Sequence, residues 1–338
     1  MKMKQHIYYL ETPLNARFHF GEVSEESNLS SSSSFCHSDT LFGAIMHNAF
    51  SMDLEKAKNL LTHFENGEIM ISSALFYLQQ RQRKIIFFPK PIIYDFVETE
   101  ETKIDLKKIK EVKMLSEGVL KQKLIPEAWF DESLCQFLQG GEFVCLKNEL
   151  DSLGQSDIYQ KMVTPKNPLS YTSNDDDERK IYYQTDVFLN SNDSFSVGYY
   201  FLLKYTDTIS EEVIVFLEES VALIKNFGLG GDRSTGAGEI SAITKEEFQW
   251  EIKTGGRNYM TLSLFTPRED NYQNGQYRTT KRGGQSLNEK QRLDFVHCIL
   301  EGGVFSEEIQ GQILKIGPEN LKYGMPYFLP LSIKNGKL

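Results

Sequence analysis

The sequence is poor in the features that mark secreted, membrane and metal-binding proteins. It has four cysteines in 338 residues, and none of them forms a C-x-x-C pair, the spacing typical of zinc and redox sites. No apolar run approaches the roughly 18 residues that a membrane helix needs, and the apolar stretch after residues 1–4 is too short for a secretion signal. We therefore expect a cytoplasmic protein with buried thiols and no membrane contact.

The six histidines are scattered along the chain, without H-x-H, H-E-x-x-H or another paired spacing of metal ligands. His37 adjoins Cys36, but neither has a partner at the spacing of a catalytic triad or a metal site. The residues thus indicate no metal, no cofactor and no catalytic group.

The charge is acidic overall but unevenly distributed. The net charge of −10 argues against indiscriminate nucleic-acid binding. Three strips are nonetheless basic: residues 79–90 carry four basic residues and no acid, residues 102–125 carry seven lysines against three acids, and residues 276–292 carry five basic residues against one acid. This pattern suits one polyanion bound along a defined track, although solvated lysine faces would look the same.

The most informative segment is the run GLGGDRSTGAG at residues 228–238, which holds five glycines in eleven residues. Glycine lets other groups approach the backbone closely, so such a loop can offer N–H groups to an anion beside the planar cation of Arg233. A P-loop is excluded, because Ala237 and Gly238 occupy the positions of its Lys and Ser/Thr. A dinucleotide fingerprint fails because Arg233 stands where its last glycine should be. An ordinary helix C-cap and tight turn remains the alternative.

The hydrophobic pattern predicts an α+β fold. We expect a strand at 5–14, a helix at 39–50 capped by Ser38, a helix at 54–64, paired strands at 69–78 and 84–89, and a hairpin at 159–188 with an acidic tip at 175–178. A strand at 195–204, a helix at 211–226 and a strand at 239–244 follow, and then strands at 260–265, 276–282, 293–300 and 323–330. The order β, α, β, β, insertion, α, β predicts a ferredoxin-like (RRM-like) unit.

We accordingly expect two ferredoxin-like domains. Residues 1–250 would form the first, with an insertion at about 90–190 and the glycine-rich loop at 228–238. Residues 251–338 would form a smaller, strand-rich RRM-like domain.

Several motifs in this order resemble the RAMP superfamily of CRISPR effector proteins, and within it the Csm-type subunits that cap the 5′ end of the guide RNA in type III-A complexes. The motifs are PLNARFHFG at 13–21, SDTLFGAI at 38–45, FPKP at 88–91, GLGGDRSTGAGEI at 228–240, SLFTP at 263–267, YRTTKRG at 277–283, EGGVF at 301–305 and YG at 323–324. At residues 165–170 the family tends to carry an Arg/Asn run that ends in Asp-Arg, whereas this chain ends it with Leu169 and Ser170.

The resemblance implies a set of RNA contacts around the glycine-rich loop, with backbone N–H groups, hydroxyls and cations on phosphates and aromatic rings on bases. His19 and Phe20 would stack on a base or contact phosphate, unless His19 is an ordinary satisfied polar residue. Asp232 is expected to orient Arg233 or to face away from the RNA. The candidate RNA-binding residues are Arg17, His19, Phe20, Gly21, Ser38, Lys90, Lys166, Asn167, Gly228, Gly230, Gly231, Arg233, Ser234, Thr235, Gly236, Gly238, Lys281 and Arg282.

The resemblance also implies a function and a set of partners. A non-catalytic subunit of this kind would hold the repeat-derived 5′ tag of the crRNA and bridge the large signature subunit to the backbone subunits in antiviral defence. It would meet target RNA only indirectly. The open alternative is a metal-independent endoribonuclease that processes CRISPR repeat RNA with a loop histidine as its general acid–base.

Overall fold

The structure is a computed structural model that describes residues 2–22, 31–96, 105–151, 156–166, 181–250, 258–268, 274–285, 292–317 and 320–332. A mixed α+β architecture is confirmed. Its centre is a nine-stranded sheet in the order β14-β1-β13-β6-β7-β8-β10-β9, with β5 also paired to β13. The strands are β1 (Met3–Glu11), β5 (Ile69–Ile71), β6 (Leu75–Gln80), β7 (Arg83–Pro89), β8 (Met114–Ser116), β9 (Cys135–Leu138), β10 (Phe143–Leu146), β13 (Ser196–Thr206) and β14 (Ala242–Glu247).

Strand β1 lies next to the edge strand β14, between two antiparallel neighbours. Tyr9 is opposite Tyr200 of β13 on one side and Thr244 of β14 on the other. β13 is buried along almost its whole length, as its near-continuous apolar sequence predicts for a central strand. The segment expected as one strand at 69–78 is two, β5 and β6, with Ser72–Ala74 between them, and both pair with β13.

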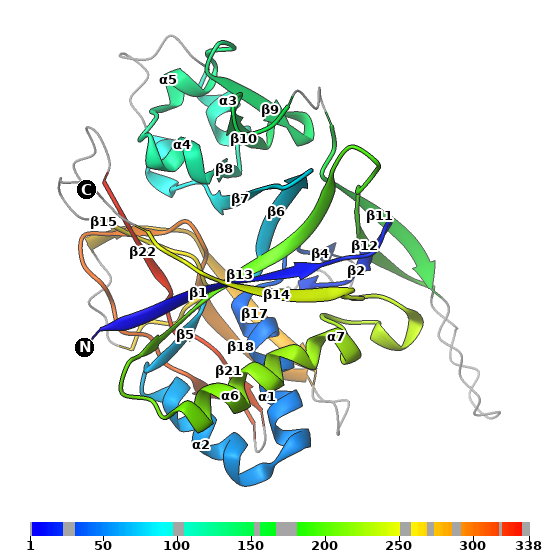
Figure 1. Ribbon diagram of the computed structural model, residues 1–338, viewed down its shortest axis with the longest axis vertical. Helices are drawn as coiled ribbons and strands as arrows, with labels where there is room; N and C mark the ends of the chain where they lie inside the picture. Colours follow the sequence, from blue (N-terminus) through cyan, green and yellow to red (C-terminus); the bar gives the residue numbers. More distant parts are fainter. Residues whose placement is uncertain are drawn as a thin grey trace.

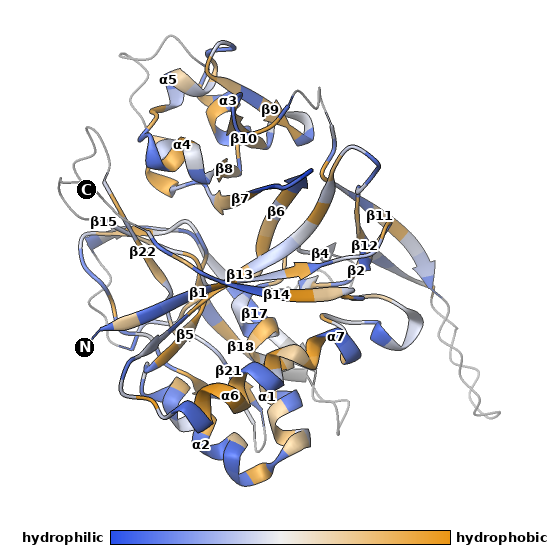
Figure 2. Cartoon of the chain, viewed as in Figure 1, coloured by the Kyte–Doolittle hydropathy of each residue, from blue (hydrophilic) through white to orange (hydrophobic). Residues whose placement is uncertain are grey.

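Four helices cover one side of the sheet, at the lower part of Figure 1: α1 (Ser38–Met52), α2 (Leu54–Glu65), α6 (Glu211–Ala222) and α7 (Ile224–Phe227). Leu41, Ile45 and Ala49 follow the helical period on α1 and are fully buried. In Figure 2, which is coloured by hydropathy, apolar residues are prominent on α6 and hydrophilic residues on α2. Burial of these stripes holds the helices on the sheet.

The predicted cap of the first helix is wrong. The helix begins at Ser38 itself, so that His37 occupies the N-cap position, without a side-chain hydrogen bond. The Ser38 hydroxyl instead donates to the carbonyl oxygen of Leu264, 3.3 Å away. A contact with a segment more than two hundred residues later cannot be seen in the local pattern.

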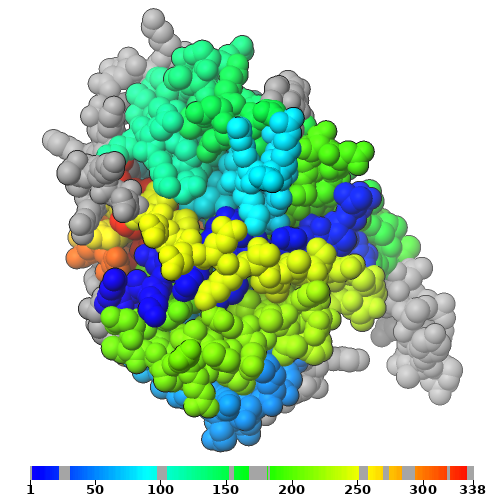
Figure 3. Space-filling model, viewed as in Figure 1, coloured from blue at the N-terminus to red at the C-terminus, as the bar shows by residue number. Residues whose placement is uncertain are grey.

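The segment that follows β7, which was expected as an insertion and is called the insertion below, lies above the band formed by β1 and β14 in Figures 1 and 3. It contains α3 (Leu106–Glu111), α4 (Glu117–Lys121), α5 (Pro126–Trp129) and strands β8–β10, which extend the central sheet. Next comes a hairpin of β11 (Tyr159–Lys166) and β12 (Tyr182–Leu189), and β12 pairs with β2 (Arg17–Phe18). The acidic tip expected at 175–178 lies outside the described residues.

The C-terminal part is built from strands in its described residues. β15 (Asn258–Thr261), β16 (Gly275–Gln276), β19 (Val304–Phe305) and β22 (Phe328–Leu331) form one sheet, while β17 (Thr279–Gln285) pairs with β18 (Arg292–Ile299) and β20 (Leu314–Lys315) with β21 (Leu321–Lys322). Met260, Tyr323 and Tyr327 belong to the same buried cluster as Ile7 and Phe42. The two parts of the chain therefore share one hydrophobic core.

Candidate nucleic-acid interface

The glycine-rich loop lies against the segment that follows β1. The N–H of Gly238 donates to the carbonyl oxygen of Arg17 at 2.7 Å, and the N–H of Gly231 donates to that of His19 at 2.8 Å. The loop closes on itself where the N–H of Leu229 donates to Gly238, and the Leu229 side chain is fully buried. Two of the sequence motifs, about two hundred residues apart, thus form one structural unit.

Close packing explains why this unit needs glycine. Gly238 has a φ of +79°, and a Cβ on it would lie 2.2 Å from the carbonyl oxygen of Leu229. Gly230 has a φ of +93°, and a Cβ there would lie 2.7 Å from the carbonyl oxygen of His19. Positive φ is strained for other residues, and these contacts are to backbone that cannot move aside. The loop's shape is therefore set by the protein itself.

Arg17 clamps the loop to the hairpin. Its guanidinium donates to the carbonyl oxygen and the hydroxyl of Thr235, at 2.8 and 2.9 Å, and also to the Asp186 carboxylate on β12, at 3.3 Å. The Asp186 side chain is almost fully buried, whereas that of Arg17 is 23% exposed. Arg17 thus has a structural task and still reaches solvent beside the loop.

Asp232 is turned toward the hairpin rather than toward Arg233. Its carboxylate accepts a hydrogen bond from Gln184 at 2.6 Å and lies 3.5 Å from the ammonium of Lys166. Partial burial alone would raise the pKa of Asp232, but the Gln184 hydrogen bond and the charges of Lys166 and His19 outweigh it and hold this pKa below its usual value. Asp232 therefore ties the base of the hairpin to the loop.

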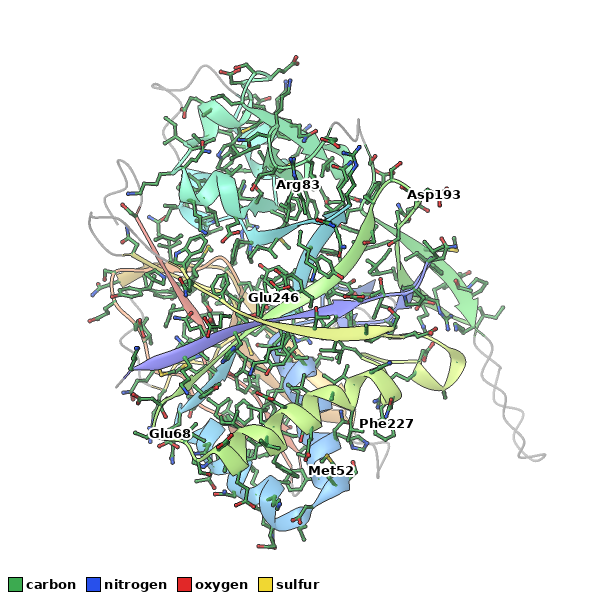
Figure 4. All side chains as sticks on the ribbon, in the orientation of Figure 1. Met52, Glu68, Arg83, Asp193, Phe227 and Glu246 are labelled. Atoms are coloured by element: carbon green, nitrogen blue, oxygen red, sulfur yellow. The ribbon has the colours of Figure 1, made fainter. Side chains whose placement is uncertain are left out.

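Arg233 is the exposed cation of the loop. It lies in a short 3-10 turn, Arg233–Thr235, and its guanidinium donates weakly to the carbonyl oxygen of Phe227, the exposed last residue of α7 labelled in Figure 4. Most of the loop's N–H groups bond within the protein. Those of Gly230, Asp232, Arg233 and Ser234 have no acceptor among the described residues. The donors left for an anion are thus concentrated around Arg233.

His19, Phe20 and Ser38 are buried, contrary to their expected role as direct RNA contacts. The His19 ring packs beneath Gly231, and its Nδ1 lies 3.0 Å from the carbonyl oxygen of Thr185. Phe20 is 3% exposed; its ring centroid lies 5.4 Å from that of Phe18 and 5.6 Å from that of Tyr199. These side chains support the interface from inside the protein and do not reach its surface, because they are packed in the interior.

Two of the expected RNA-contacting cations form buried ion pairs. The Lys90 ammonium lies 2.5 Å from the Asp95 carboxylate, and burial lowers the pKa of Lys90. The Arg282 guanidinium makes a two-pronged contact with Asp39, at 3.1 Å for each bond. Lys281 is exposed, and Asn167 lies outside the described residues.

A cavity of about 660 Å³ collects the basic strips seen in the sequence. Lys90 comes from the first strip, Lys110 and Lys113 from the second, and Arg278, Lys281 and Arg282 from the third. The third strip lies far along the chain from the first two, and all three meet here because segments next to β7, in α3 and in β17 line the same cavity.

Sequence reasoning missed the residues that position this interface. Gln184, Asp186 and Lys161 belong to a hairpin whose strands were predicted, but their partners lie in distant segments. Glu301 was noted only as part of a motif, yet it bonds His37.

Among the described residues, no group of three or more His, Cys, Asp or Glu side chains is arranged to hold a metal ion. None of the helices in the described part of the chain is long and apolar enough to cross a membrane.

Comparisons with known proteins find similarity to one family. The CRISPR Csm4 C-terminal domain family matches residues 254–331. The CRISPR system Cms protein Csm4 of Methanocaldococcus jannaschii is 28% identical over 348 aligned positions, which cover 92% of this chain and 88% of that protein. These matches confirm the resemblance to the Csm4 family. The Csm4 protein of Streptococcus thermophilus is 28% identical over a shorter stretch, 35% of this chain and 45% of that protein.

Solved structures support the fold of the Csm4 family over nearly the whole chain. A chain of the Csm3–Csm4 subcomplex of a type III-A CRISPR-Cas interference complex matches with a TM-score of 0.70 at 19% identity, covering 97% of this chain and 99% of that one. A chain of a Csm1–Csm4 cassette in complex with pppApA matches with a TM-score of 0.56 at 15% identity, covering 99% of this chain and all of the other.

Proposed function

We propose that this chain is a non-catalytic subunit of a type III-A CRISPR interference complex that holds the repeat-derived 5′ tag of the crRNA. The observation that carries this proposal is the glycine-rich loop, clamped by Arg17 and Asp232 between β2 and the hairpin, with Arg233 exposed beside N–H groups that have no acceptor in the described structure. A phosphate of a single strand fits a planar cation next to free backbone donors.

The proposal includes the bridge between partners and the domain arrangement. The similar solved chains were found with Csm1 and with Csm3, which supports contacts of this chain with a large signature subunit and with a backbone subunit, and only indirect contact with target RNA. The strand order β14-β1-β13-β6, with α1 and α6 as connections, supports a ferredoxin-like unit. A second such unit at 251–338 stays a prediction.

The endoribonuclease alternative is not favoured. Its candidate, His19, is packed beneath Gly231 with its side chain 10% exposed, and its Nδ1 contacts Thr185 and Asp186. A general acid–base must reach the proton that it transfers, and this ring is committed to the packing of the loop.

The test is the binding of RNA that carries the tag, with Arg233→Ala against Arg81→Ala as a matched control. Arg81 is an exposed arginine paired with Asp151, away from the loop. We expect Arg233→Ala to weaken tag binding about fivefold to tenfold and to reduce the salt dependence by about 0.7 in the slope, as for one lost phosphate contact of a single strand. Arg81→Ala should leave both unchanged.

The binding mixture is also run on a denaturing gel, with and without divalent metal. Intact RNA in every lane is the expected result. Cleavage that disappears in His19→Ala would contradict the non-catalytic function, and equal binding by wild type and Arg233→Ala would contradict the assignment of the site.

A further inference from the structure

Four lysine and arginine side chains are buried among the described residues. Three of them form ion pairs with buried aspartates: Lys90, Arg282 and Lys322. The fourth, Lys204 on β13, is 8% exposed and forms neither an ion pair nor a hydrogen bond in the part of the chain that the structure describes. Burying an ammonium without a counter-charge is costly, so this side chain differs from the other three.

Lys204 lies at the joint between the central sheet and the C-terminal part. On β13 it is opposite Gln5 of β1 on one side and Met70 of β5 on the other, and such cross-strand neighbours share one face of a sheet. The Lys204 Nζ lies 4.8 Å from the centroid of the Tyr327 ring, and the Tyr327 hydroxyl donates to Gln5. An aromatic ring and neutral side chains therefore surround this amino group.

The Lys204 amino group nevertheless keeps a contact with solvent. In the described residues, the side-chain atoms that are both sealed from solvent and without a hydrogen-bond partner are Thr244 Oγ1 and Gln276 Oε1. The Lys204 Nζ also lacks a partner but is not one of these sealed atoms, so it remains accessible. A small reagent can therefore reach an amine whose stem is buried.

The surroundings of Lys204 shift its side chain toward the neutral amine. Burial lowers the pKa of Lys204, and the charge of the exposed Glu308, in the stretch after β19, opposes this only in part. Tyr327 adds no charge, because its hydroxyl keeps its proton and donates it to Gln5. The neutral amine is the form with a lone pair that can attack an electrophile.

We propose that Lys204 is a nucleophilic lysine that takes an acyl group from a small acyl phosphate. The lone pair of Nζ forms a bond to the acyl carbon, the bond from that carbon to the phosphate oxygen breaks, and inorganic phosphate leaves with that electron pair. The proton that the nitrogen loses goes to the phosphate. The product is a neutral amide, which removes the charge of Lys204 from the joint between β13 and the C-terminal part.

The test treats the full, folded chain with acetyl phosphate over a range of pH and follows each lysine by mass spectrometry. Restricted access scales the whole rate profile of a lysine, whereas the pH at which the profile levels off reports when its amine becomes neutral. We expect the rate at Lys204 to level off at a lower pH than the rate at the exposed Lys107 of α3. At pH 7 Lys204 should react about fivefold faster, because the rate follows the neutral fraction of the amine. After unfolding in urea the two lysines should react alike.

Two neighbouring acids provide a matched pair of variants. Glu308→Gln removes the charge that acts on Lys204, and we expect acetylation of Lys204 at pH 7 to become about twofold faster, the scale of one exposed charge interaction. Glu307→Gln, at an exposed position beside it, should leave the rate unchanged. Thermal unfolding that matches wild type in both variants shows that the fold is intact.

The proposal is overturned if Lys204 of the folded chain stays unmodified while Lys107 is acetylated. It is also overturned if the two rate profiles level off at the same pH, because burial then does not keep the Lys204 amine neutral. Equal effects of Glu308→Gln and Glu307→Gln would reject it as well, since the net charge of the protein and not the surroundings of Lys204 would then set the rate.

Discussion

Asp39 illustrates at the scale of one residue how a local pattern can explain a position without giving the partner. An acid in the first turn of a helix is what the helix dipole favours, and Asp39 does lie in the first turn of α1. Its carboxylate, however, is buried against Arg282, with the Lys322 ammonium at 2.6 Å. Burial alone would raise the pKa of Asp39, but these two cations outweigh it and hold the pKa well below its usual value.

The variant Asp39→Asn should lose about 3 kcal/mol of unfolding free energy near neutral pH, because it leaves two buried cations without their counter-charge. The folded pKa lies below the unfolded value of about 3.9. The contribution is therefore complete above that pH and is lost as the pH falls through the folded pKa. Urea unfolding at pH 7 and pH 3 should show the difference from wild type shrinking in acid.

The exposed Asp193, labelled in Figure 4, provides the control, since Asp193→Asn should match wild type at both values of pH. A difference for Asp39→Asn that stays constant from pH 7 to pH 3 would mean that ionisation of this carboxyl does not stabilise the fold.

Asp232 is a second acid whose partners only the tertiary structure shows. The sequence shows a carboxylate in a loop proposed to bind phosphate, which looks unfavourable. The structure gives it Gln184 and Lys166 as partners on the hairpin, so its charge is engaged and its backbone holds a φ of +55°, a region that Asp tolerates better than most residues.

At the scale of elements, the glycine-rich loop and the start of the β2 segment behave as one unit. Each contributes backbone to the other, and the base of the hairpin is tied to both through Arg17 and Asp232. The glycines within the loop nevertheless differ in what surrounds them. Gly238 faces the backbone of Leu229, whereas Gly236, with a φ of +83°, has open space where a Cβ would be.

This difference predicts unequal costs for the same substitution. Gly236→Ala should lose only about 1 kcal/mol, the cost of a positive φ. Gly238→Ala has the same cost and would also place a Cβ 2.2 Å from the carbonyl oxygen of Leu229. The melting temperature of this variant should therefore fall clearly further. Thermal unfolding of the pair measures this, and equal melting temperatures would show that the loop adapts to a side chain at 238.

The hairpin shows how far the sequence carries an element. The sequence predicted a hairpin at 159–188 without bounds for its two strands, and the structure gives these as β11 and β12, paired from Tyr159 with Leu189 to Lys166 with Tyr182. Pairing of β12 with the two-residue β2 could not be predicted, since two residues carry no periodicity.

At the scale of the whole molecule, the two predicted domains are joined through their interiors. The Tyr323 hydroxyl accepts a hydrogen bond from the N–H of Ile71, and the Tyr327 hydroxyl donates to the Gln5 side chain. The Trp250 ring N–H donates to the carbonyl oxygen of Pro330. Tyr323 and Tyr327 are fully buried, so separating the parts would expose large aromatic surfaces and unsatisfied hydroxyls.

We therefore expect thermal unfolding in one cooperative transition, with equal calorimetric and van't Hoff enthalpies. Differential scanning calorimetry of the full chain measures both. Two resolved transitions, or a calorimetric enthalpy about twice the van't Hoff value, would mean that residues 1–250 and 251–338 are independent folding units.

The sequence by itself determined the α+β class, most helices and strands, the glycine-rich loop and the family resemblance, because local periodicity and short motifs set these. Only the tertiary structure decided which charges are free. Lys90 and Arg282 read as RNA contacts but are buried with Asp95 and Asp39, while Arg233 remains exposed. A cation's partner is fixed by which distant segments pack together, and desolvation at that contact decides whether its charge can serve a ligand.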